Sequence, residues 1–116
     1  MIVRNKSNGA KTEALTAFSI LPQIRGLMFR SRPVCILFDF HEDAIHPIHS
    51  LFVFFPFYAI YISKEKKILE KARIGPFQLL HKNSSAARYL LETDIKTGEN
   101  FSPGDEVDFD AGVENK

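Results

Sequence analysis

The chain has one cysteine and no tryptophan, and these shortages bear on its redox compartment and on the make-up of its core. The single cysteine, Cys35, excludes an intramolecular disulfide and indicates a reducing compartment, so we expect a cytoplasmic protein. The aromatic residues are eleven phenylalanines and three tyrosines, without a tryptophan. Because phenylalanine carries no polar group, most of these rings are expected in a hydrophobic core.

The chain also lacks a long apolar segment. Its longest apolar run, residues 51–62, is interrupted by Pro56. A membrane-spanning helix needs about 20 apolar residues, so we expect no membrane partner.

The net charge is only +1, so no overall field draws the chain to nucleic acid. The charge is unevenly distributed, however. Residues 1–91 hold 13 basic and 6 acidic residues, whereas residues 92–116 hold 2 basic and 8 acidic ones. The acidic end would repel phosphates, which argues against nucleic-acid binding.

What is present predicts one mainly β domain. At 116 residues the chain is long enough for a single core. Apolar alternation predicts strands at residues 34–40, 51–55, 57–62, 67–74, 88–92 and 106–109, with weaker ones near residue 2 and over 12–18. We expect a short helix over residues 20–28 and one helical turn within 94–101. These elements, separated by Gly/Pro turns, predict a small antiparallel β-sandwich or barrel-like domain with one or two short helices.

Three regions follow from the same pattern. Residues 1–11 form a polar leader, residues 12–109 the β-rich domain, and residues 110–116 an acidic tail that we expect to be disordered. Within strand 34–40 the alternation places Ile36 and Phe38 on one face and Cys35 and Leu37 on the other. In strand 67–74 it places Ile68 and Ile74 on one face.

Four sequence blocks resemble a known family, the domain of unknown function 192. The strongest is Arg-Gly-Leu-Met-Phe-Arg at residues 25–30. Residues 45–56 resemble the archaeal-type version of the family, an Ile-His pair followed by an aromatic strand that ends in proline. Residues 87–92 and 103–107 resemble the pattern near the C-terminal end of the family's sequences. The resemblance implies a compact, mostly antiparallel β fold and no established activity.

These blocks supply the candidate ligand-binding residues, Arg25, Arg30, His46 and His49. An arginine can hold a small anionic ligand, a carboxylate or phosphate, through two parallel hydrogen bonds. Arg25 or Arg30 can instead pair with a carboxylate such as Glu92 and lock the fold. The leading hypothesis is a non-enzymatic module that binds a small ligand or a protein partner, without a cofactor.

The alternative is a metal-dependent hydrolase that uses His46, His49 and a nearby carboxylate. Three or four ligands must converge on a metal ion, and Pro47 lies inside the His-x-x-His pair, where a regular helix is not expected. Ser50 follows His49 directly, so on a strand the two point to opposite faces and do not suit nucleophilic catalysis. Cys35 has no cationic neighbour in the sequence and is expected to be an inert thiol.

Overall fold

Two β-sheets and one short helix make up residues 1–17, 34–45, 53–76 and 82–110, which a computed structural model describes. The larger sheet has five strands, in the order β3 (Leu15–Ala17), β4 (Ile36–Ala44), β7 (Ala87–Thr93), β5 (Phe57–Ile62) and β6 (Ile68–Ile74). The smaller sheet has three strands, in the order β2 (Lys11–Glu13), β1 (Ile2–Asn5) and β8 (Val107–Asp110). The helix α2 (Ile95–Gly98) follows β7.

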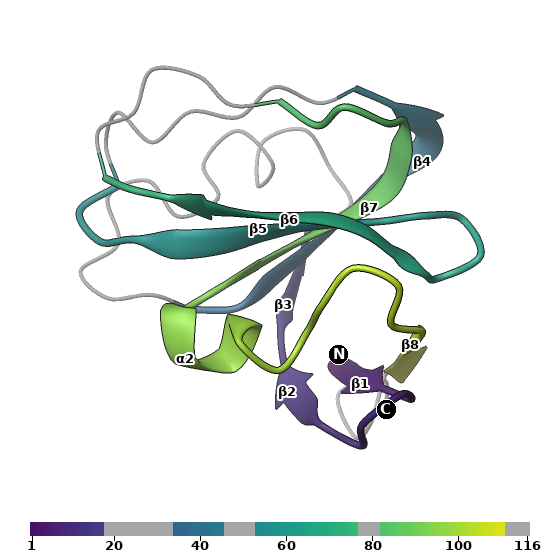
Figure 1. Ribbon diagram of the computed structural model, residues 1–116, viewed down its shortest axis with the longest axis horizontal. Helices are drawn as coiled ribbons and strands as arrows, with labels where there is room; N and C mark the ends of the chain where they lie inside the picture. The colour runs from purple at the N-terminus through teal and green to yellow at the C-terminus, as the bar shows by residue number, and fades with distance from the viewer. Residues whose placement is uncertain (18–33, 46–52, 77–81, 111–116) are drawn as a thin grey trace.

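The small sheet and α2 lie on one side of the large sheet (Figure 1). All pairings between the named strands are antiparallel except that of β3 with β4, which is parallel. The predicted mainly β, sandwich-like domain is therefore confirmed. At four residues, α2 is too short to cross a bilayer, and no helix of the described residues has the length and apolarity for it.

The large sheet buries both of its faces, in two separate clusters. We call the side toward the small sheet the sandwiched face. Its buried residues are Val3, Ala14, Leu37, Ile60, Ile62, Ile68, Leu91, Phe101 and Val107. We call the other side the opposite face. Its buried residues are Ile36, Phe38, Val53, Phe57, Ala59, Tyr61, Ile74, Ala87 and Leu90.

Strand β4 confirms the predicted alternation and runs further than expected. Ile36 and Phe38 belong to the opposite face, and Leu37 to the sandwiched face. The sequence places a connection from residue 41, but β4 continues to Ala44 across a register shift. There the Asp39 Oδ1 accepts a hydrogen bond from the His41 backbone N–H at 2.9 Å, and His41 has φ 64°. This local turn within a strand is a β-bulge, which apolar periodicity does not reveal.

Two other expectations are wrong in part. A strand over 51–55 is not found in its described residues, because Val53 and Phe54 lie outside any strand and Phe55 forms a bend before Pro56. Proline has no N–H to donate and restricts the residue before it. Ile68 does not share a face with Ile74, because a register shift between Tyr61 and Ile62 turns it to the sandwiched face.

The turn and helix at the end of the chain agree with the sequence. The Asp105 backbone N–H donates to the Ser102 carbonyl at 3.0 Å, and Gly104 takes φ 92°, which favours glycine. Asp94 caps α2, its carboxylate accepting from the Thr97 N–H. Residues 2–5 of the polar leader form β1, whose Val3 is fully buried. The helix predicted over residues 20–28 lies outside the described residues.

Candidate functional site

The four residues singled out in the sequence, Arg25, Arg30, His46 and His49, lie outside the described residues. Their role as a ligand site stays a prediction. Within residues 1–17, 34–45, 53–76 and 82–110, no group of three or more His, Cys, Asp or Glu side chains is placed to hold a metal ion. The described residues therefore lend no support to the metal-dependent hydrolase.

The described residues contain a different polar site, the carboxyl group of Glu92. Strand β7 lies between β4 and β5, and Glu92 stands opposite Ile36 on one side and Ala59 on the other. Alternation along β7 places Glu92 on the same face as Leu90, which belongs to the opposite face of the large sheet. The alternation along β7 thus places the Glu92 carboxyl group in an apolar layer.

The Glu92 side chain is buried and incompletely hydrogen-bonded. Only 6% of the residue is exposed, and its Oε1 has no hydrogen-bond partner. Burial raises the pKa of the Glu92 carboxyl from its ordinary value of 4.5 to about 8, because the charged form loses its hydration. At neutral pH the group is therefore mostly a neutral carboxylic acid, which can donate one hydrogen bond as well as accept others.

Two further side chains that carry oxygen atoms, those of Tyr61 and Glu70, interact electrostatically in the same region as Glu92. Burial raises the pKa of the Tyr61 hydroxyl, and the negative charges of Glu92 and Glu70 raise it further. Tyr61 pairs with Leu90 on β7 and with Glu70 on β6, so it bridges the two carboxyl-bearing strands. Glu92, Tyr61 and Glu70 are therefore close enough to interact electrostatically across three neighbouring strands.

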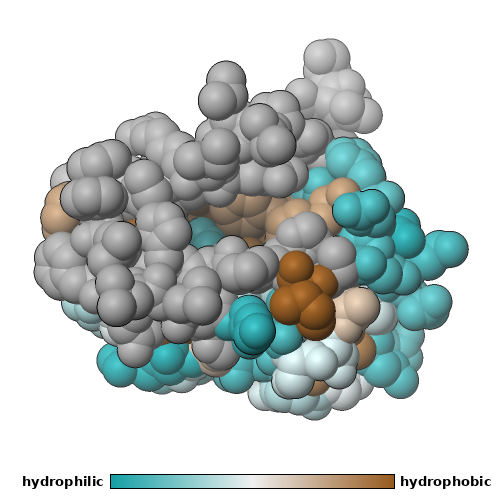
Figure 2. Space-filling model, turned by 90° about the horizontal axis from the view of Figure 1, so that it is seen from above, coloured by the Kyte–Doolittle hydropathy of each residue, from teal (hydrophilic) through white to brown (hydrophobic). Residues whose placement is uncertain are grey.

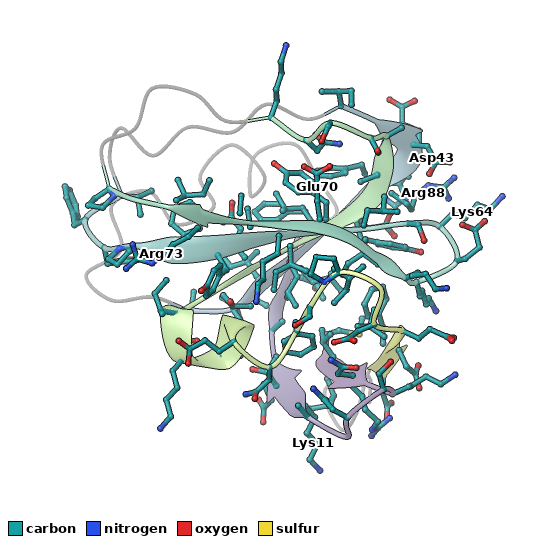
Figure 3. All side chains as sticks on the ribbon, in the orientation of Figure 1. Lys11, Asp43, Lys64, Glu70, Arg73 and Arg88 are labelled. Carbon is teal, nitrogen blue, oxygen red and sulfur yellow. The ribbon has the colours of Figure 1, made fainter. Side chains whose placement is uncertain are left out.

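Glu70 has its own hydrogen bonds. Its carboxylate accepts from the backbone N–H of Ser84 at 2.9 Å, from the Ser84 hydroxyl at 3.1 Å and from the Ser85 N–H at 3.3 Å. Figure 3 shows Glu70 on the side of the large sheet away from the small sheet. These bonds hold the Glu70 side chain beside Ser84 and Ser85, whereas the Glu92 residue is buried, with 6% exposed.

The surroundings of Glu92 are apolar and aromatic. The opposite face contributes Phe38, Phe57 and Tyr61 to its buried cluster. Figure 2 looks down on this side of the molecule and shows apolar, tan to brown surface among its described residues. Apolar concavities with a few polar groups are the usual form of small-ligand sites.

The cation Arg88, four residues before Glu92 on β7, is already paired. Its Nε lies 3.0 Å from the Asp43 carboxylate on β4, and the two labelled side chains lie near one another in Figure 3. The distance along a strand from residue 88 to residue 92 is roughly 13 Å. Arg88 therefore does not neutralise Glu92.

Cys35 lies on the sandwiched face and fits the expectation of an unreactive thiol. It is half-buried, and burial raises the pKa of its thiol. The Thr12 hydroxyl lies 3.6 Å from its sulfur, and the Asp94 carboxylate lies 3.8 Å away. A raised pKa keeps the thiol protonated at neutral pH and hence weakly nucleophilic.

Sequence reasoning considered Glu92 only as a partner for an arginine. Those arginines, Arg25 and Arg30, lie outside the described residues, so that pairing stays a prediction. The signal in the sequence is the run Leu90-Leu91-Glu92, in which an acid continues an apolar strand. Only the two apolar clusters, one on each face of the large sheet, show that both faces of β7 are buried.

The fold and its buried carboxyl define a β-sandwich domain with a polar group inside its core. The chain matches the model of the DUF192 family, described as "Uncharacterized ACR", over residues 2–109. The chain belongs to this family, as the sequence blocks indicated. A comparison with curated proteins gave no significant match.

Two crystal structures have the same fold. One is of a putative transcription regulator from Sinorhizobium meliloti 1021, with a TM-score of 0.81 and 21% identity over 92% of this chain and 91% of that one. The other is of a protein of unknown function from Novosphingobium aromaticivorans DSM 12444, with a TM-score of 0.82 and 17% identity over 93% of this chain and 82% of that one. At these identities the similarity establishes the fold alone.

Proposed function

We propose that this domain is a non-enzymatic binding module and that its small-molecule ligand contacts Glu92 on the opposite face of the large sheet. The observation that carries the proposal is a carboxyl group 6% exposed, with an unpartnered oxygen, in a layer of apolar and aromatic side chains. Such a group is costly to bury, by about 1 to 3 kcal/mol for an unmade hydrogen bond.

That cost makes a purely structural role a poor explanation for Glu92. A leucine at residue 92 would continue the apolar layer, and a well-packed apolar side chain is usually at least as stable as a buried polar one. Strongly perturbed ionisable groups concentrate at functional sites, although structural networks also produce them. Glu92 belongs to no described network that satisfies it, so a ligand that completes its hydrogen bonding is the better account.

The test is a thermal-shift screen of small amines, alcohols, carbonyl compounds and carboxylates against the wild-type chain and a Glu92→Gln variant. A ligand present at 100 times its dissociation constant stabilises the folded state by about 2.7 kcal/mol. We expect at least one class to stabilise the wild type and to lose its effect in Glu92→Gln. The matched control is Asp108→Asn, which removes a carboxylate whose side chain is 45% exposed on β8.

Ligands that stabilise the wild type and Glu92→Gln equally would show that binding takes place elsewhere. A panel without any stabilising compound would likewise overturn the proposal that this face is a small-molecule site. Asp108→Asn should behave as the wild type in either case.

We propose that Arg25, Arg30, His46 and His49 form a second ligand contact of the same module, one that holds a small carboxylate or phosphate rather than the ligand of Glu92. Support comes from the sequence blocks that carry the family resemblance. Alanine variants of Arg25 and His49 should weaken binding and leave the melting temperature within a few degrees of the wild type. A loss of stability as large as that of a core truncation would instead make these residues structural. The lone cysteine supports a reducing compartment such as the cytoplasm for this activity.

A further inference from the structure

We propose that the ligand of the Glu92 site is a primary amine, bound as its ammonium ion with the Glu92 carboxylate as counter-ion. This inference rests on the proposed function, since it names the ligand class for the same site. Its basis is the pair of carboxyl groups and the aromatic composition of the opposite face.

The described charged groups of this face are the carboxyl groups of Glu92 and Glu70 and the ion pair of Arg88 with Asp43. Glu92 and Glu70 both act on the Tyr61 hydroxyl, so two carboxyl groups converge on one region from β7 and β6. The cation Arg88 has the same parity as Glu92 on β7 and is paired with the Asp43 carboxylate on β4 at 3.0 Å. The Glu92 and Glu70 carboxylates would repel an anionic ligand, whereas they would attract a cation.

The apolar part of the site also suits an ammonium ion. Phe38, Phe57 and Tyr61 belong to the same buried cluster. Aromatic faces attract a cation by about 0.5 to 2 kcal/mol, with the larger values at desolvated sites. An ammonium group carries three N–H donors, which can reach the unpartnered Glu92 Oε1 and other acceptors at once. A neutral alcohol supplies one donor and gains no charge pairing.

Binding of an ammonium ion should release a proton. Without ligand the Glu92 carboxyl is mostly protonated at pH 7, because burial raises its pKa to about 8. The bound state pairs the carboxylate with the ammonium ion, so the carboxyl proton leaves to the buffer and no covalent bond forms. Affinity should therefore rise about tenfold per pH unit between pH 6 and pH 7 and level off above pH 8.

Three matched probes test the ligand class: benzylamine, benzyl alcohol and benzoate, which share a ring and differ in charge. Binding to the full chain is measured by isothermal titration calorimetry at pH 6, 7 and 8. Each titration is repeated in two buffers of different ionisation enthalpy, which gives the number of protons released. The variants are Glu92→Gln and the control Asp108→Asn, each checked for its fold by circular dichroism.

We expect benzylamine to bind best, to release close to one proton at pH 7, and to weaken about 30-fold or more in Glu92→Gln. Asp108→Asn should leave its affinity within about threefold, because its carboxylate lies on the small sheet. Benzoate should bind more weakly than either of the other probes.

The outcomes separate this inference from the proposed function. Benzyl alcohol bound as tightly as benzylamine, without proton release but lost in Glu92→Gln, would overturn the ammonium class and leave the site standing. Benzylamine bound equally by the wild type and Glu92→Gln would overturn the inference, because the counter-ion would be another group. If no probe binds the wild type, the ammonium class is overturned for this scaffold, and the broader screen decides the site.

Discussion

Among the described residues, each face of the large sheet has a cluster of nine buried apolar residues, but the two faces differ in how their buried polar groups are hydrogen-bonded. On the sandwiched face, the buried Asn5 is fully hydrogen-bonded. Its Nδ2 donates to the Asn100 carbonyl and to the Asp105 carboxylate, both at 2.8 Å, and its Oδ1 accepts from the Ser7 N–H at 2.9 Å. On the opposite face, the buried Glu92 keeps an oxygen without a partner.

On the sandwiched face, α2 packs closely against strands β5 and β6. Lys71 extends over the Tyr58 ring, 4.6 Å from its centroid, and donates to the Gly98 carbonyl at 3.1 Å. A Cβ at Gly98 would collide with the Tyr58 ring and the Thr93 hydroxyl. This face is built to hold the small sheet and α2 in place, whereas the opposite face carries the group that a ligand can complete.

The largest expected effect is on the sandwiched face, at Phe101. This ring is 1% exposed, and Phe101→Ala should lower the free energy of unfolding by about 3 to 5 kcal/mol, because it removes a buried ring and leaves a cavity. Urea denaturation measures the change. Benzylamine affinity of the folded variant should stay within about threefold of the wild type.

A control for the Phe101 experiment is Phe54→Ala. Phe54 is 52% exposed, so its removal should change stability by less than about 1 kcal/mol. If Phe101→Ala abolished benzylamine binding while the protein remained folded, the assignment of ligand binding to the opposite face alone would be wrong.

The next effect is on the opposite face and depends on pH. Glu92 has a folded-state pKa of about 8, above its ordinary value of 4.5. Below about pH 4.5 Glu92 is protonated in both the folded and the unfolded chain, so it does not weaken the fold. As the pH rises toward 8, the unfolded chain ionises more readily than the folded protein, and the free energy of unfolding falls. Glu92→Gln removes this loss, so the variant should gain on the order of 3 kcal/mol over the wild type between pH 5 and pH 8.

Urea denaturation of both proteins at several pH values measures that difference. The remaining carboxylates affect wild type and variant alike, so their pH dependence cancels in the comparison. A stability difference that did not change with pH would mean that Glu92 keeps an ordinary pKa in the folded protein.

The smallest of the three effects concerns Asn5 on the sandwiched face. Asn5→Ala removes its side-chain hydrogen bonds and should cost about 1 to 3 kcal/mol at any pH from 5 to 8. Asn8→Ala is the matched control, because Asn8 bonds the same Asn100 carbonyl at 2.9 Å from an exposed position. The control should lose less than about 1 kcal/mol, and equal losses would show that burial of Asn5 adds nothing.

Much of the fold could be predicted from apolar alternation. The faces of Ile36, Phe38 and Leu37, the turn at Gly104 and the strand of residues 57–62 follow from period-two patterns and turn chemistry. The extension of β4 past His41 and the reversal of Ile68 could not be predicted, because each depends on a register shift between partner strands. Such shifts are set by cross-strand pairing and leave no periodic signal in one strand.

The Glu92 site could not be predicted from the sequence, and the residues that were predicted stay untested. The sequence blocks directed attention to the arginines and histidines of residues 25–30 and 45–56, which lie outside the described residues. Glu92 falls inside the quoted block 87–92, yet its chemistry depends on which strands flank it. A glutamate at the end of an apolar strand is ordinarily a solvated surface group.

The sequence by itself determined that this is a mainly β domain of the DUF192 family, since local alternation, turn residues and the family blocks are all properties of the chain. Only the tertiary structure decided that the Glu92 carboxyl group is buried and that its pKa is raised. Placing β7 between β4 and β5, with apolar clusters on both faces, removes water from its carboxyl. Desolvation depends on neighbours that are distant in sequence, so burial turned an ordinary acidic residue into the proposed ligand contact.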